Sequence, residues 1–274
     1  MKKILFTFSI LVFMLFFMSC SKTDYPRESQ SSGEELSSAL LGEFSVSATK
    51  KVRFSKGNLY WDGSAFHFEK CQYDHYGYWE DNHVRHFFWS KTASVAYAEE
   101  YKDPDRREND VLFTNSTPET AKSDFTVDNI TGKYRTLSNE EWKYLFETRT
   151  NADNLYKCGV TVCGLSNCVV IAPDNWDINT NPLQTSYSAP DWVKAEAIGL
   201  VCLPATGIRS TTEYDGNYNP RIFGVGYYGN YWSSSAIDTN FAYFVKFLQN
   251  RIYTNEYQNR FDVGCSIRLV LDIK

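Results

Sequence analysis

The chain has 274 residues, of which 43% are hydrophobic and 16% aromatic, so it can bury one large core or two small ones and is not a disordered chain. Its formal net charge is −5, and no basic run with interleaved aromatic residues stands out, which argues against nucleic-acid binding. No internal repeat is evident in the sequence.

The first 20 residues have the order of segments found in an export signal. Lys2-Lys3 precedes an apolar run, Ile4–Met18, which is shorter than the roughly 20 residues needed to span a bilayer. Ser19 and Cys20 follow directly, a pattern that resembles a bacterial lipoprotein signal. The resemblance implies that residues 1–19 are removed and that lipid is attached to Cys20. The alternative is a plain signal peptide followed by a coincidental cysteine.

The segment after the signal, residues 20–42, is rich in Ser and Glu and holds few large aliphatic residues. Such a segment cannot bury enough apolar surface to order itself, so we expect a flexible tether. The folded domain is expected over residues 43–274. A lipidated Cys20 would hold the protein on the cell outer membrane without a transmembrane helix, facing either the periplasm or the outside.

Alternating apolar and polar residues predict short strands along much of the domain. Asn58–Trp61 and Ser64–Phe68 flank Asp62-Gly63, and two such residues between strand-like runs are the strongest short hairpin signal. The other strands are expected at Phe44–Ala48, Val52–Phe54, Phe87–Trp89, Cys168–Ala172, Leu200–Leu203 and Phe241–Leu248.

A first helix is expected to begin at Ser138, because Glu141 lies three residues later and can complete a capping box. Leu137 and Trp142 occupy the two positions of a hydrophobic staple at the same end. The apolar residues that recur at helical spacing, and that we therefore expect to face the core, are Trp142, Leu145 and Phe146.

A second helix is expected to follow the same logic, with Ser188 as its cap. Trp192, Ala195 and Ile198 form its apolar stripe, and Gly199 ends it. Two helices among many short strands predict an α+β domain.

Several motifs resemble one family over most of residues 43–271. They are Tyr134–Trp142, Val201–Arg209, the Tyr-Trp-Ser-Ser element Tyr231–Ser234, the strand pattern that follows it, and Gly264–Val270. Together they resemble the Fibrobacter succinogenes major paralogous (FISUMP) domain of Bacteroidetes lipoproteins. That group is similar in fold to the formylglycine-generating enzyme and to the variable proteins of diversity-generating retroelements. The resemblance implies a C-type-lectin-like α+β domain with two helices and short antiparallel strands. These motifs are structural, so they support the fold more than a function.

Besides Cys20 the chain holds six cysteines, and an even number in an exported protein permits disulfides without fixing their connectivity. They are Cys71, Cys158, Cys163, Cys168, Cys202 and Cys265. The resemblance to formylglycine-generating enzymes makes Cys202 and Cys265 candidates for a reactive pair. Both lie among apolar residues and are expected to point inward, so we expect a packed or disulfide role, with no catalytic residue and no cofactor.

Few residues suit a metal site. No ligand motif frames the four histidines, which are His67, His75, His83 and His86. Asp81-Asn82 and Asp103–Asp105 offer oxygen ligands for calcium. The motifs that sugar-binding C-type lectins use for calcium are missing, so we expect no metal.

In the segment Tyr253–Asn259, Tyr and Asn occupy every second residue. Alternate residues of a strand share a face, so an extended segment would present these side chains together. Tyr and Asn give large contact area and adaptable hydrogen bonds, as in a paratope; the alternative is an ordinary aromatic edge strand. The same region varies in retroelement-diversified relatives. The candidate ligand-binding residues are Tyr227, Tyr228, Asn230, Asn240, Asn250, Tyr253, Asn255, Tyr257 and Asn259.

The sequence therefore predicts a lipid-anchored cell-envelope protein, not an enzyme, that binds a glycan or a surface protein through this Tyr/Asn-rich face. Tyr253 and Tyr257 are expected to be its aromatic anchors. The alternatives are a structural envelope or fimbrial component and an oxidoreductase similar to formylglycine-generating enzymes.

Overall fold

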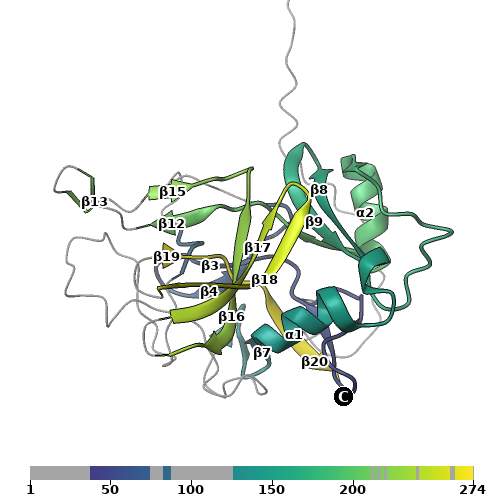
Figure 1. Cartoon of the computed structure of the whole chain (residues 1–274), viewed down its shortest axis with the longest axis horizontal. Coiled ribbons are helices and arrows are strands. Elements are labelled where there is room, and N and C mark those ends of the chain that lie inside the picture. The colour runs from purple at the N-terminus through teal and green to yellow at the C-terminus, as the bar shows by residue number, and fades with distance from the viewer. Residues whose placement is uncertain are drawn as a thin grey trace, which may run out of the picture. The chain divides into compact units, whose positions relative to one another are not determined.

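The structure, a computed structural model, describes residues 38–74, 83–87, 126–210, 213–214, 217–218, 221–238, 241–259 and 263–273. Strands make up 47% of it and helices 13%, so the fold is predominantly β and the expected α+β class is wrong (Figure 1). The fold class differs from the expectation because of the lengths of the helices and strands. Helix α1 (Asn139–Lys143) has five residues, whereas strand β16 (Gly229–Ala236) continues through polar residues that show no apolar alternation.

The described strands form two four-stranded sheets, two three-stranded sheets and three two-stranded hairpins. One four-stranded sheet has the order β1 (Phe44–Ser45), β2 (Lys51–Phe54), β20 (Leu269–Ile273) and β7 (Tyr134–Thr136). The other has the order β10 (Ser186–Tyr187), β8 (Tyr156–Val162), β9 (Leu165–Ile171) and β11 (Val201–Leu203). Strands β10 and β8 run parallel, and the other neighbours in these two sheets run antiparallel.

The three-stranded sheets are both antiparallel. One has the order β15 (Arg221–Phe223), β12 (Ile208–Ser210) and β19 (Val263–Gly264). The other has the order β16, β17 (Phe241–Leu248) and β18 (Arg251–Asn259). The hairpins are β3 (Leu59–Trp61) with β4 (Phe66–Phe68), β5 (Thr126–Val127) with β6 (Ile130–Thr131), and β13 (Glu213–Tyr214) with β14 (Asn217–Tyr218).

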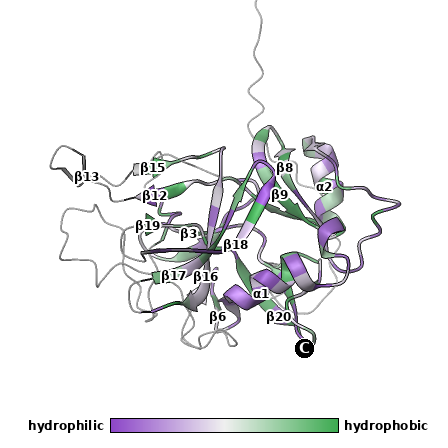
Figure 2. Cartoon of the chain, in the orientation of Figure 1, coloured by the Kyte–Doolittle hydropathy of each residue, from purple (hydrophilic) through white to green (hydrophobic). Residues whose placement is uncertain are grey.

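The sheet β16-β17-β18 separates two apolar cores. Its register pairs Trp232 with Phe244 and Tyr231 with Val245, so adjacent residues of each strand point to opposite faces. Trp232 and Phe244 pack with the β3-β4 hairpin in one core, and Tyr231 and Val245 pack with α1 in the other. A third core lies between strand β9 and helix α2 (Ala189–Ala197). Figure 2 shows that β9 is mainly hydrophobic, whereas α2 contains both hydrophobic and hydrophilic residues.

The expected start of α1 is confirmed. The Ser138 hydroxyl accepts a hydrogen bond from the Glu141 N–H at 3.1 Å, and the Glu141 carboxylate accepts one from the Ser138 N–H at 2.8 Å. Leu137 and Trp142 are both fully buried, as the staple requires. Leu145 and Phe146 are also buried, although they lie in a π-helical turn, Tyr144–Thr148, that continues the helix.

Helix α2 has the expected cap at Ser188 and buries Trp192 and Ala195. Gly199 follows it with a φ of 101°, the left-handed conformation common just after a helix. Ile198 is 54% exposed, so its expected place in the apolar stripe is wrong. The helix ends at Ala197, and Ile198 therefore has no helical neighbours to align it with the core. None of the helices in the described part of the chain combines the length and the apolar composition needed to cross a bilayer.

Two local expectations differ in detail. The β3-β4 hairpin is present, but its loop has four residues rather than two, because the Asp62 carboxylate accepts hydrogen bonds from the N–H groups of Ser64 and Ala65. Ala39 and Leu40 are buried, and the Leu40 N–H donates to the Phe54 carbonyl at 2.8 Å. The packed structure therefore includes residues 38–42, which the composition had assigned to the tether.

Candidate functional site

Strand β18 does not present its tyrosines on one face. Its register with β17 pairs Phe244 with Glu256 and Lys246 with Tyr253, so three steps along β18 match two steps along β17. A β-bulge of this kind inserts one residue and reverses the alternation beyond it. Tyr253 therefore lies on the face of Lys246, and Tyr257 lies on the opposite face. The expectation of a single Tyr-Asn face is wrong for this reason.

Tyr253 instead lies opposite Lys246 of β17, whose ammonium group lies near Tyr228, the residue just before β16. Lys246 is the direct partner of Tyr253 on β18 and of Asn230 on β16. The Lys246 Nζ atom lies 6.0 Å from the ring centre of Tyr228, where the ring quadrupole attracts a cation. We call Tyr228, Lys246 and Tyr253 the tyrosine–lysine row. All three are partly exposed, and the neighbouring Tyr227 is 74% exposed.

Two glycines and a buried asparagine hold Tyr228 in place. Gly224 has a φ of 72°, and a Cβ atom there would lie 2.1 Å from the Tyr228 ring, so the ring needs a glycine beneath it. The Gly207 N–H donates to the Tyr228 carbonyl at 2.8 Å. Asn230 is 1% exposed and donates from Nδ2 to the Gly207 carbonyl at 3.1 Å. Asn230, a candidate ligand contact, thus lies inside the fold and positions the Tyr228 turn.

A buried histidine, His86, holds Thr206, the residue that precedes Gly207. His86 is 3% exposed, and its Nε2 lies 2.8 Å from the carbonyl of Thr206. The Ser266 hydroxyl donates to the Thr206 hydroxyl at 2.8 Å. The pKa of His86 is lowered to about 4, mainly by burial and in smaller part by the charge of Arg209, although the hydrogen bond to Thr206 opposes the shift. The imidazole is therefore neutral at pH 7 and donates from Nε2, while Nδ1 has no hydrogen-bond partner among the described residues.

We expect His86 to make the protein less stable at acidic pH. The unfolded chain protonates this histidine below its ordinary pKa of about 6.5, whereas the folded chain does so only near 4. The unfolded state therefore binds more protons within this window, and stability falls as the pH falls through it. The full shift corresponds to about 3 kcal/mol of unfolding free energy.

Urea unfolding at pH about 7 and about 4.5 measures this effect. His86→Gln keeps an N–H donor for Thr206 and cannot titrate, so we expect the variant to lose about 2 kcal/mol less than the wild type between the two pH values. Equal losses in the two proteins would show that His86 is not the group responsible.

The other candidate ligand residues lie apart from the row. Asn250 is exposed at the turn between β17 and β18. Asn255 is exposed near α1, where the Asn139 Nδ2 group donates to its Oδ1 atom at 3.4 Å. Tyr257 is 56% exposed and contacts the Phe241 ring edge-to-face. Outside the described residues lie Asn240 and the side chain of Asn259.

The structure does not bring Cys202 and Cys265 together. Cys202 belongs to the core beside α2, whereas Cys265 pairs with Phe87 in the core beside the β3-β4 hairpin. Both are fully buried, and burial raises the pKa of each thiol well above its ordinary value. A reactive thiolate needs an electropositive and partly exposed setting, which neither position provides.

The described histidines take part in hydrogen bonds and ring contacts. His67 lies between two carboxylates, with Nδ1 2.9 Å from Asp128 and Nε2 3.1 Å from Asp62, and His83 stacks on Tyr60 at 4.8 Å. Within the described ranges, no group of three or more His, Cys, Asp or Glu side chains is arranged to hold a metal ion. The expected calcium candidates and one histidine lie outside those ranges: Asp81, Asn82, Asp103, Asp105 and His75.

No family model matches the chain, and no curated protein and no solved structure matches it. The resemblance to the FISUMP family therefore stays a prediction that rests on the sequence motifs.

Sequence reasoning missed Lys246, the centre of the row. A signal for it was present, because Lys246 is the one charged residue within the apolar run Phe241–Leu248. A charge placed inside a buried strand pattern indicates a point at which one face of the strand reaches solvent.

Proposed function

We propose that the protein is a lipid-anchored cell-envelope protein that binds a glycan or a surface protein through the tyrosine–lysine row and Tyr227. The row itself supports the proposal, because Lys246 lies opposite the partly exposed Tyr253 in the sheet and its ammonium group lies near the ring of the partly exposed Tyr228. Aromatic rings give rigid contact area at low entropic cost, and an ammonium group adds strong donors. Such a surface suits a ligand that has both an apolar face and acceptor oxygens.

The support behind the row favours binding as well. The Tyr228 carbonyl accepts a hydrogen bond from the Gly207 N–H, and Asn230 in turn donates to the Gly207 carbonyl. Gly224 lies close to the Tyr228 ring, so the turn is ordered before a ligand arrives. A preorganised surface loses less conformational entropy on binding, which leaves more of the contact energy as affinity. The anchor is proposed from the signal ending at Cys20, outside the described residues.

We expect Tyr253→Ala to weaken binding by at least about 30-fold, because aromatic hot spots cost about 2 kcal/mol or more when truncated. The ligand is first identified by applying the mature protein in detergent to a glycan array and a protein array. Affinities of the wild type and the variant for that ligand are then measured by titration calorimetry.

Tyr257→Ala is the matched control, because Tyr257 lies on the same strand, is 56% exposed and faces the other way. We expect its affinity to stay within about twofold of the wild type. If Tyr257→Ala abolishes binding while Tyr253→Ala does not, the ligand occupies the opposite face of β18 and the proposed row is incorrect.

A further inference from the structure

Two positively charged side chains lie on the face of the sheet that carries Tyr253. Strand β18 pairs Tyr253 with Lys246 and Arg251 with Leu248 of β17. Paired residues share a face, and so do residues two apart along a strand, so Lys246, Tyr253 and Arg251 all project from one face. Arg251 is exposed and Lys246 is partly exposed. Two cations thus border Tyr253 in a protein whose formal net charge is −5.

Neither cation is neutralised by a carboxylate within the part of the chain that the structure describes. No Asp or Glu there forms an ion pair with Lys246 or Arg251. Glu256 lies on the same face, opposite Phe244 and beyond the β-bulge, and does not pair with Lys246. The Lys246 ammonium group lies 6.0 Å from the centre of the Tyr228 ring, which compensates its charge only in part. Both cations therefore remain available to an anionic group.

The spacing of these side chains suits a sugar ring. Lys246 and Tyr253 lie on adjacent strands, which are about 4.8 Å apart, a separation comparable with one pyranose ring. A tyrosine ring can pack on the C–H face of a sugar while the neighbouring ammonium group meets an acidic group on the same sugar. An extended peptide gains affinity from the backbone groups of a strand edge, which side chains on a sheet face do not supply. The geometry therefore favours an acidic sugar over an acidic peptide.

We propose that this face binds an acidic sugar, with its carboxylate or sulfate group between Lys246 and Arg251 and its apolar face on Tyr253. The inference rests on the proposed binding function and narrows its ligand to anionic glycans. Lys246 and Arg251 are diagonal neighbours, with Cα atoms about 7–8 Å apart, so their long side chains can reach one group between them. Glu256 repels an anion and so disfavours the opposite orientation of the sugar.

The test applies the mature protein in detergent to an array of uronic-acid, sialic-acid, sulfated and neutral oligosaccharides. We expect binding to acidic members only, and the carboxylated and sulfated members distinguish the two acidic groups. Titration calorimetry then gives the Kd of the strongest ligand. Raising NaCl from about 50 mM to about 500 mM should weaken this binding at least about fivefold, because the Debye length falls from about 14 Å to about 4 Å.

We expect Lys246→Met to weaken binding of that oligosaccharide at least about tenfold, because Met keeps the apolar stem of the side chain without its charge. Lys246→Arg keeps the charge and should stay within about threefold of the wild type. Glu256→Gln removes the repulsion and should strengthen binding about twofold. Lys194→Met is the charge-matched control, because Lys194 is exposed on α2, and its Kd should change by less than about twofold.

Two results would overturn the inference and leave the proposed binding function intact: a neutral oligosaccharide that binds as tightly as the acidic ones, or a ligand found only on the protein array. Unchanged affinity in Lys246→Met would overturn it too. The absence of a ligand on both arrays would overturn the proposed function as well. Circular dichroism checks that Lys246→Met folds; if it does not, Arg251→Gln takes its place, with an expected loss of at least about threefold in affinity.

Discussion

Trp142→Ala is expected to lower the free energy of unfolding by about 3–5 kcal/mol, the usual range for truncating a buried tryptophan. Trp142 is fully buried in the core beside α1. Its ring stacks on Phe146 with centres 5.8 Å apart and lies 6.1 Å from Phe54 on β2. The truncation removes contacts on both sides and leaves a cavity between a helix and a sheet that cannot easily close. Urea denaturation followed by circular dichroism measures the loss.

Val193→Ala provides the control, because Val193 is 48% exposed on α2. Its stability should stay within about 0.5 kcal/mol of the wild type, as for other surface sites. Trp142→Phe keeps an aromatic ring and should fall between the two. If Trp142→Ala also stays within about 0.5 kcal/mol, then α1 does not pack on the β2 sheet as the structure has it.

Elements that depend on neighbouring residues were predictable from the sequence. The Ser138 and Glu141 side chains lie one helical turn apart, so their pairing follows from local spacing alone. The strand Phe241–Leu248 was also predicted with its observed bounds, because its apolar character sets it apart from the polar residues on both sides. In both cases the decisive interactions lie within a few residues, and the surrounding fold does not override them.

Features that depend on pairing between distant segments were not predictable. The bulge in β18 arises where its register with β17 shifts, and nothing in the Tyr-Asn alternation itself marks that point. The surface that the alternation predicted is therefore split between two faces, and only Tyr253 joins Tyr228 and Lys246.

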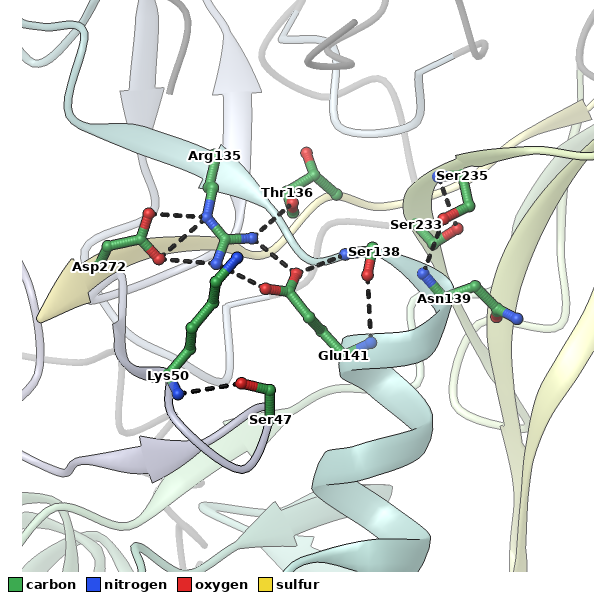
Figure 3. A network of polar contacts seen from close by, with 10 residues as sticks. All are labelled: Ser47, Lys50, Arg135, Thr136, Ser138, Asn139, Glu141, Ser233, Ser235 and Asp272. Atoms are coloured by element: carbon green, nitrogen blue, oxygen red, sulfur yellow. Dashed lines mark hydrogen bonds and ion pairs between the residues drawn. The ribbon is translucent and has the colours of Figure 1, made fainter. Parts of the chain in front are cut away.

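Arg135→Met is expected to destabilise the protein by about 3–5 kcal/mol, because it leaves a buried carboxylate without its cation. The Arg135 side chain is fully buried and forms two parallel hydrogen bonds with Glu141, at 2.6 and 2.7 Å (Figure 3). It also donates to Asp272 on β20 at 2.6 and 2.9 Å. Burial alone would lower the pKa of Arg135, but the bonds to Asp272 and Glu141 outweigh it and raise that pKa, so the guanidinium stays charged. One side chain thus joins β7, α1 and β20.

A double-mutant cycle distinguishes the charge interaction between Arg135 and Glu141 from a simple loss of packing. Glu141→Gln should cost less than Arg135→Met, because its amide oxygen can still accept the Ser138 N–H and Arg135 keeps Asp272. In the double variant no charged carboxylate remains at position 141, so its loss should fall short of the sum of the single losses by more than about 1 kcal/mol. The cost of Arg135→Met should also shrink as the pH falls, because an unpaired buried carboxylate has a raised pKa and becomes neutral by binding a proton. Additive losses that do not change with pH would mean that Arg135 stabilises the junction through packing rather than through its charge.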